Sequence, residues 1–144
     1  AAAADTLEFT GLDDDAREAW VRERTAGRGA DVVIEATGAP VAVVQAMRTV
    51  RDAGRVVVVG QYTDHGEIPF NPHLDLNKKH ADVLGCWGSD YSHFHRTVAL
   101  LSDAGRARPW GTMRLDRYGL DRAQQALDDV AGGRVIKALI DPAL

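Results

Sequence analysis

RVVVVG, residues 55–60, is the stretch of sequence that decides the fold. Its four consecutive valines show no alternation between apolar and polar positions. A strand that is apolar at every position must be covered on both faces, which is typical of an interior strand in a parallel sheet. DVVIEA, residues 31–36, is another β-branched run, and it also predicts a strand.

Segments with a helical spacing of apolar residues alternate with these runs. Asp13 is placed to cap a helix that continues to about Ala26. Pro40 is placed in the first turn of a second helix, which Gly54 is expected to close. The remaining expected elements are helices after Asn71-Pro72, at 91–104 and at 120–130, with strands at 6–9, 81–87, 112–115 and 135–140.

Strands that alternate with helices at this spacing predict an α/β fold with a doubly wound, mostly parallel sheet. The 144 residues are 45% hydrophobic and carry a formal net charge of −4, which disfavours a nucleic-acid partner. No apolar run is long enough to span a bilayer. The single cysteine, Cys86, excludes an internal disulfide and a multi-cysteine zinc site. We expect a cytoplasmic protein that binds neither nucleic acid nor membrane.

Three expected strands end in small or glycine-rich turns, at 35–38, 59–61 and 85–89. In open α/β sheets, ligands bind beyond the carboxyl ends of the strands, and glycine lets a flat ligand lie against bare backbone. The alternative is that these glycines only permit tight turns. No G-x-G-x-x-G fingerprint occurs in the chain, so either the fold does not bind a dinucleotide or its phosphate loop lies upstream.

In series, these segments resemble the zinc-type medium-chain alcohol and polyol dehydrogenases. GADVVIEATG, residues 29–38, is similar to the fourth strand of their cofactor domain, and residues 46–60 are similar to the next helix and strand. Asn71-Pro72 together with LGCWGS, residues 84–89, resembles the approach to their sixth strand. GRVIKALI, residues 133–140, resembles the return of the chain to the catalytic domain.

The resemblance implies a partial Rossmann-like fold that lacks its first two strands. It places a nucleotide-binding part at 1–110 and, at 111–144, a segment that returns to a GroES-like catalytic domain. The zinc ligands and the catalytic residues would lie upstream, so the chain alone is expected to be inactive. The intact enzyme would transfer a hydride between an alcohol or carbonyl substrate and NAD or NADP, with assistance from zinc.

By position in this match, three turns and one strand end should meet the cofactor. The residues are Ala36, Thr37 and Gly38 on the adenosine side, Val59, Gly60 and Gln61 under the nicotinamide ribose and ring, Cys86, Trp87 and Gly88 at the carboxamide, and Lys137 near the pyrophosphate.

The resemblance also implies a homo-oligomer, because the family's sixth strand, here near 81–87, pairs with its twin across a sheet edge. Two other functions remain open at this point. One is a non-catalytic α/β interaction module. The other is a fragment of an S-adenosylmethionine-dependent methyltransferase, which also uses a doubly wound sheet.

Several conspicuous residues have structural interpretations. Cys86 has no basic neighbour in sequence to activate its thiol and is expected to be structural. His93 and His95 lie two apart on an expected helix, so they point to nearly opposite sides and cannot hold one metal ion. Glu35 is expected to orient neighbouring groups, and residues 13–15 are expected to cap a helix.

Overall fold

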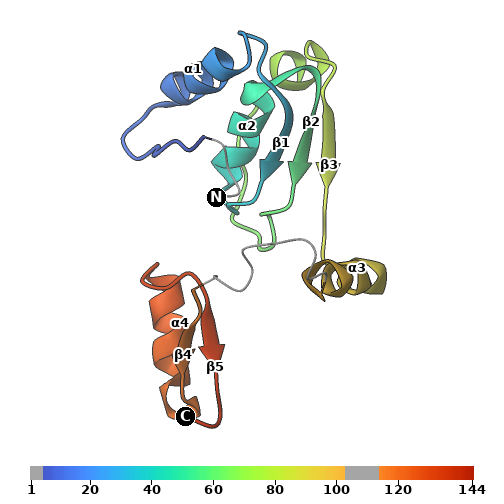
Figure 1. Cartoon of the computed structure of the whole chain (residues 1–144). Helices are drawn as coiled ribbons and strands as arrows, with labels where there is room; N and C mark the ends of the chain where they lie inside the picture. Colours follow the sequence, from blue (N-terminus) through green and yellow to red (C-terminus); the bar gives the residue numbers. More distant parts are fainter. Residues whose placement is uncertain (1–4, 103–113) are drawn as a thin grey trace. The chain divides into compact units, whose positions relative to one another are not determined.

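The computed structural model describes residues 5–102 and 114–144 (Figure 1). It divides the chain into two compact units, Ala1–Gly88 and Ser89–Leu144. The domain boundary expected between residues 110 and 111 lies outside the described residues. In the part of the chain that is described, no helix is both long enough and apolar enough to cross a membrane.

The first unit is a three-stranded sheet in the order β1-β2-β3, in which both neighbouring pairs are parallel. The α/β prediction is therefore confirmed, as is the interior position of the valine run. The elements, in chain order, are α1 (Asp14–Arg24), β1 (Ala30–Glu35), α2 (Pro40–Thr49), β2 (Val50–Val58), the π-helix η1 (Pro72–Asn77) and β3 (Asp82–Gly85).

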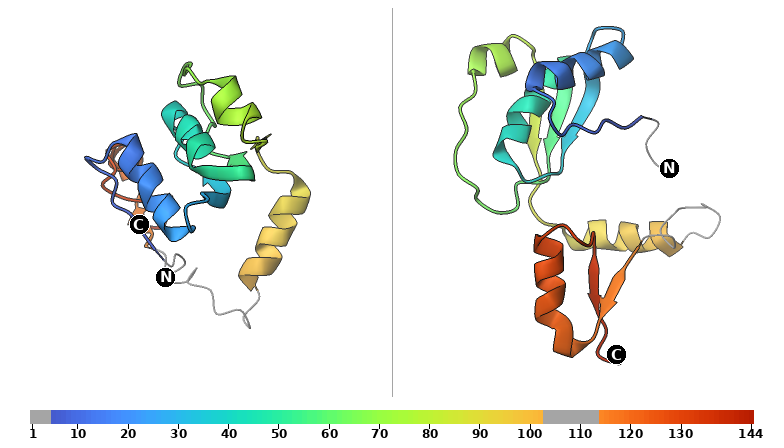
Figure 2. Two further views of the ribbon diagram at one scale, coloured as in Figure 1. Left: turned by 90° about the horizontal axis from the view of Figure 1, so that it is seen from above. Right: turned by 90° about the vertical axis from the view of Figure 1, so that its left-hand side faces the viewer.

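The core of this unit lies between α2 and one face of the sheet (Figure 2). Val56, at the centre of β2, is 0% exposed and packs with Ala46, Met47 and Val50. Part of η1 reaches the same cluster through Leu76. The connection from β1 to β2, which contains α2, and the connection from β2 to β3, which contains η1, therefore pack on the same face of the sheet. This is expected when successive parallel crossovers share one hand.

Within the first unit, no described element covers the opposite face of the sheet. Ile34 is 65% exposed, and Val32 and Leu84 on the same face are also exposed. The expectation that the valine run is covered on both faces is thus wrong for the described residues. The physical reason is that α2 and η1 pack on the same side.

The junction between α2 and β2 also differs from the sequence-based prediction. The helix ends at Thr49 instead of continuing to Gly54, and β2 begins at Val50. The register shifts between the pairs Ala30↔Val50 and Val32↔Arg55, so β2 contains extra residues here. Glycine is needed at position 54 in this irregular part of the strand, because a Cβ there would lie 2.6 Å from the Val50 side chain. It permits a close approach within the strand and does not stop a helix.

The ends of several elements follow local hydrogen bonds. The Asp13 carboxylate accepts from the backbone N–H of Ala16 at 2.8 Å, which confirms the cap of α1. Asn71 similarly caps η1 by accepting from the N–H groups of His73 and Leu74. No strand forms at residues 6–9, where the Glu8 carboxylate instead accepts bonds from Thr10.

The second unit contains a two-stranded parallel sheet, β4-β5. The hydroxyl of Tyr118 on β4 donates to Asp129 at 2.9 Å, and Asp129 also pairs with Arg134. The elements are α3 (Tyr91–Ser102), β4 (Asp116–Tyr118), the 3-10 helix η3 (Leu120–Arg122), α4 (Ala123–Ala131) and β5 (Ala138–Ile140).

The strands of this second unit differ from the sequence-based expectations. Residues 112–113 of the expected strand at 112–115 lie outside the described residues, and the observed strand begins at Asp116. The expected strand at 135–140 is shortened to Ala138–Ile140. At the expected start of this strand, the N–H of Val135 instead donates to the backbone carbonyl of Asp129 at the end of α4, at 3.4 Å.

We expect Val56→Ala to lower the free energy of unfolding by about 2–3 kcal/mol, because it removes methyl groups from a fully packed position and leaves a cavity. Val32→Ala is the matched control, since it makes the same chemical change on the exposed face and should cost less than about 0.5 kcal/mol. Urea denaturation measures both. Equal losses would show that the core does not lie between α2 and the sheet.

Candidate functional site

Three turns meet at one edge of the first unit because all three strands run parallel. The strand residues Glu35, Val58 and Gly85 stand side by side in the ladder. The turns that follow them contain nine of the ten residues expected to contact a cofactor, namely Ala36, Thr37 and Gly38, Val59, Gly60 and Gln61, and Cys86, Trp87 and Gly88. The tenth, Lys137, lies in the second unit, is exposed, and immediately precedes β5.

Glu35 holds the first two turns together. It is the last residue of β1 and is only 3% exposed. One carboxylate oxygen accepts from the N–H and the hydroxyl of Thr37 at 2.7 and 2.8 Å, and from the N–H of Gly38 at 2.9 Å. The other oxygen accepts from the N–H of Gly60 at 3.2 Å. A single buried carboxylate therefore fixes the backbone after β1 and β2.

This environment favours the ionised form of Glu35. Burial raises the pKa of the carboxyl, but bonds from Thr37 and Gly38 and the proximity of Gln61 outweigh burial and hold the pKa below its ordinary value. The side-chain amide nitrogen of Gln61 is itself buried and has no acceptor in hydrogen-bonding geometry among residues 5–102 and 114–144. Gln61 therefore acts on Glu35 by proximity and not through a well-formed hydrogen bond.

The first two turns also touch backbone to backbone, and glycine makes this possible. A Cβ at Gly60 would lie 2.5 Å from the nitrogen of Gly38 and 2.7 Å from the nitrogen of Thr37. Real Cβ atoms do not approach so closely, so any larger residue would push the turns apart. The glycines at 38 and 60 thus bring two strand ends into direct contact.

The third turn carries exposed groups. The N–H of Cys86 donates to the carbonyl of Val58 at 3.0 Å, so this donor already extends the β2–β3 ladder. Trp87 is 76% exposed, and its ring stacks on that of Tyr62 with centroids 5.4 Å apart. An aromatic pair from two different turns therefore stands at the same edge as the glycines.

Sequence reasoning found the turns but missed what connects them. It expected Glu35 to orient neighbouring groups without saying which, and the structure identifies them as its own turn and Gly60. It gave no role to Tyr62, whose partner Trp87 is distant in sequence. The described residues include no group of three or more His, Cys, Asp or Glu side chains that could hold a metal ion.

Comparison with known proteins identifies relatives across most of the chain. Residues 4–103 match the family described as zinc-binding dehydrogenase. The chain is 29% identical to 5-exo-hydroxycamphor dehydrogenase from Pseudomonas putida, over 99% of this chain and 39% of that protein. It is 30% identical to D-arabinitol dehydrogenase 1 from Uromyces fabae, over 94% of this chain and 38% of that protein.

Solved structures give a similar result. The structure of an alcohol dehydrogenase from Thermotoga maritima superposes with a TM-score of 0.83 at 29% identity, over 96% of this chain and 37% of that one. The partial Rossmann-like fold is therefore confirmed. The chain spans less than two fifths of the length of these relatives.

We expect Glu35→Gln to lower the free energy of unfolding by about 1–3 kcal/mol near neutral pH, because an amide cannot accept bonds on both sides of the site as a carboxylate does. A group whose pKa is lowered by folding stabilises the fold above its ordinary pKa, here 4.5, and loses this contribution as the pH falls through the folded-state value. The deficit of the variant should therefore shrink in acid.

Urea denaturation from about pH 7 down to acid pH measures this difference. Glu67→Gln is the control, because this substitution removes the same charge from an exposed residue in the loop after β2. If the Glu35 variant and the wild type lose stability in parallel as the pH falls, then the ionised carboxylate does not hold the turns.

Proposed function

We propose that this chain, which belongs to the zinc-binding dehydrogenase family, supplies part of the cofactor site in an alcohol or polyol dehydrogenase. The observation that carries this proposal is the contact between the glycine turns after β1 and β2, beside the exposed turn after β3. Family membership favours an oxidoreductase over both alternatives raised from the sequence, the interaction module and the methyltransferase fragment.

The residues of this edge fit NAD or NADP. Gly60 and Gly38 bring the two turns together without intervening side chains, and a flat ring and ribose would lie against the joined backbone. A carboxamide needs both a donor and an acceptor. Because the N–H of Cys86 is already bonded to Val58, we assign the acceptor to the carbonyl of Cys86 and the donor to the N–H of Gly88.

The remaining contacts follow the same arrangement. Ala36, Thr37 and Gly38 would border the adenosine side, and Lys137 would contribute a cation near the pyrophosphate. The bound cofactor supplies hydride transfer, and the protein supplies orientation. Glu35 contributes indirectly, because it fixes the backbone on which the cofactor would lie.

Zinc does not fit the residues of this chain, since the described part has no group of three potential ligands. In the proposed enzyme, the zinc ligands and most of the substrate pocket would come from protein outside this chain. The chain alone would accordingly bind cofactor weakly and not turn over an alcohol.

We expect titration with NADH to shift NMR resonances of the three turns in a saturable way, with a dissociation constant of about 1 mM or weaker. The amides of Gly38, Gly60 and Gly88 and the indole N–H of Trp87 should move. The amide of Gly119, which precedes η3 in the second unit, is the internal control. If NADH shifts other resonances and leaves the three turns unchanged, the cofactor site is misplaced.

We further propose that β3 pairs with β3 of a second copy. In support, β3 is the last strand in the sheet order, and all four of its residues are exposed. Its outer backbone groups are open to strand addition, to which such edges are prone.

Sedimentation at increasing concentration should therefore reveal a dimer. Leu84→Lys should weaken it, because a charge on an edge strand opposes pairing. Leu120→Lys, at an exposed position outside the first unit, should leave it unchanged. A strictly monomeric wild type at high concentration would contradict the proposal.

A further inference from the structure

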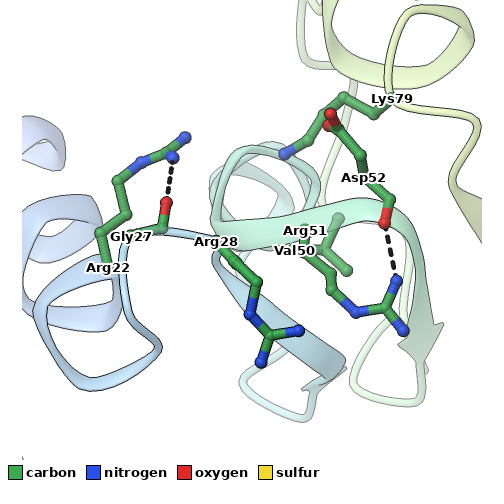
Figure 3. Close-up of a pocket in the computed structure, with 7 residues that line it drawn as sticks. All are labelled: Arg22, Gly27, Arg28, Val50, Arg51, Asp52 and Lys79. Carbon is green, nitrogen blue, oxygen red and sulfur yellow. Dashed lines mark hydrogen bonds between the residues drawn. The ribbon is translucent and has the colours of Figure 1, made fainter.

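A hollow of about 520 Å³ opens at the amino ends of the strands, opposite the edge that carries the turns. Its lining includes the beginning of β2 and the segment before β1. It is therefore a separate feature from the proposed cofactor site. The residues that line it are Arg22, Gly27, Arg28, Val50, Arg51, Asp52 and Lys79 (Figure 3).

The lining carries four cations and one carboxylate, that of Asp52. Two of the cations are already paired with carboxylates. Arg22 donates two bonds to Glu18, and Arg51 donates to Asp31 at 2.5 Å. In the described part of the chain, neither Arg28 nor Lys79 forms an ion pair. The hollow therefore holds two cations without a direct ion-pair partner, although Asp31 lies near Arg28 and Asp52 lies near Lys79.

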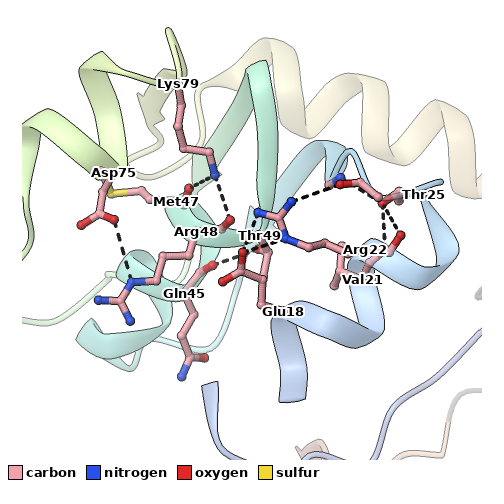
Figure 4. A network of polar contacts seen from close by, with 12 residues as sticks. Glu18, Val21, Arg22, Thr25, Gln45, Met47, Arg48, Thr49, Asp75 and Lys79 are labelled. Carbon is pink, nitrogen blue, oxygen red and sulfur yellow. Dashed lines mark hydrogen bonds and ion pairs between the residues drawn. The ribbon is translucent and has the colours of Figure 1, made fainter. Parts of the chain in front are cut away.

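Lys79 has a structural role that leaves part of its ammonium free. It donates to the carbonyls of Met47 and Arg48 at 2.7 and 2.8 Å (Figure 4), where the last turn of α2 exposes unpaired acceptors. An ammonium has three N–H donors, so one remains. Burial also lowers the pKa of Lys79, which means that its charge is poorly solvated where it stands.

Arg28 has no such structural explanation. Its side chain is exposed and forms no hydrogen bond with any described residue. Its backbone nevertheless is held in place, because its N–H donates to the carbonyl of Thr25 at 3.1 Å. A Cβ on Gly29 would lie 2.8 Å from the carbonyl oxygen of Thr49, so this turn is pressed against the start of β2.

The positions of the two arginines support a common ligand. In Figure 3, the guanidinium groups of Arg28 and Arg51 extend to the same side. Arg51 uses one nitrogen for Asp31 and another for the carbonyl of Asp52, so one terminal nitrogen stays available. The planar guanidinium fork matches the geometry of oxyanions.

We propose that this hollow binds a small, multiply charged oxyanion such as phosphate or pyrophosphate, held mainly by Arg28 with Arg51 at its side. The neighbouring hollow around Arg48 is less suited, because three carboxylates line it beside four cations, namely those of Glu18, Asp52 and Asp75. No aromatic side chain lines the proposed site, so a nucleoside attached to the phosphate finds no stacking partner.

We test the proposal by titrating the chain with pyrophosphate at low salt and following the amides of Gly27, Arg28 and Arg51 by NMR. Saturable shifts with a dissociation constant of about 1 mM support it. Arg28→Gln should weaken binding about tenfold, because it removes a charge-assisted contact. Asp52→Asn should strengthen binding roughly two- to fivefold, since it removes the carboxylate that repels the anion.

Arg55→Gln is the matched control. It removes the same charge from β2, but Arg55 pairs with Asp82 at 2.9 Å and does not line the hollow. Binding to this variant should stay within about twofold of the wild type. Equal weakening by Arg28→Gln and Arg55→Gln, or the absence of saturable shifts in the wild type, overturns the proposal, because net charge alone would then explain any binding.

A parallel titration with AMP distinguishes free anion from nucleotide. Equal affinities for AMP and inorganic phosphate support the assignment, and clearly tighter binding of AMP overturns it in favour of a nucleoside site. The result is independent of the proposed function, because cofactor binding is followed at Gly38, Gly60 and Gly88 and anion binding is followed at Gly27, Arg28 and Arg51.

Discussion

The parallel pairing of β2 with a neighbour on each side is the constraint on which the first unit depends. Parallel strands need crossovers, and crossovers of one hand bring α2 and η1 to the same face. This arrangement buries Val56 completely. It also brings the three carboxyl ends to one edge, where residues that are 25 positions apart, Glu35 and Gly60, share a hydrogen bond. The position of the candidate site is thus a consequence of strand direction.

The elements of this unit could be predicted from local signals, because each depends on residues within a few positions. The valine run, the Asp13 cap and the Asn71-Pro72 start all appear in the structure. The predicted end of α2 was wrong because a glycine can either stop a helix or permit a close contact within a strand. Gly54 resembles a helix stop, but it serves a register shift whose cause is its contact with Val50. No pattern in the sequence separates these uses, because the deciding contact exists only after the strands pair.

The candidate site shows the same limit at longer range. Glycines after strands predicted the turns, but no sequence pattern indicates how closely the turns after β1 and β2 approach each other. That distance depends on the Glu35 carboxylate and on the absence of side chains at Gly38 and Gly60. Tyr62 and Trp87 likewise meet only because β2 and β3 are neighbours. Pairing between strands, and not composition, supplies these contacts.

The two ends of the sheet differ in electrostatics for one reason, which is the direction of the helices. In a parallel crossover, the carboxyl end of each helix lies at the amino edge of the strands, so α1 and α2 direct unpaired carbonyls and negative dipole ends toward that edge. Cations near this edge are therefore expected, and Lys79 is one of them, because its ammonium donates to two carbonyls at the end of α2. Arg28 does not compensate a helix end in this way, because no described carbonyl or carboxylate accepts a hydrogen bond from its guanidinium. Compensation of the helix dipoles thus explains part of the positive charge at this edge, and the part that remains is centred on Arg28.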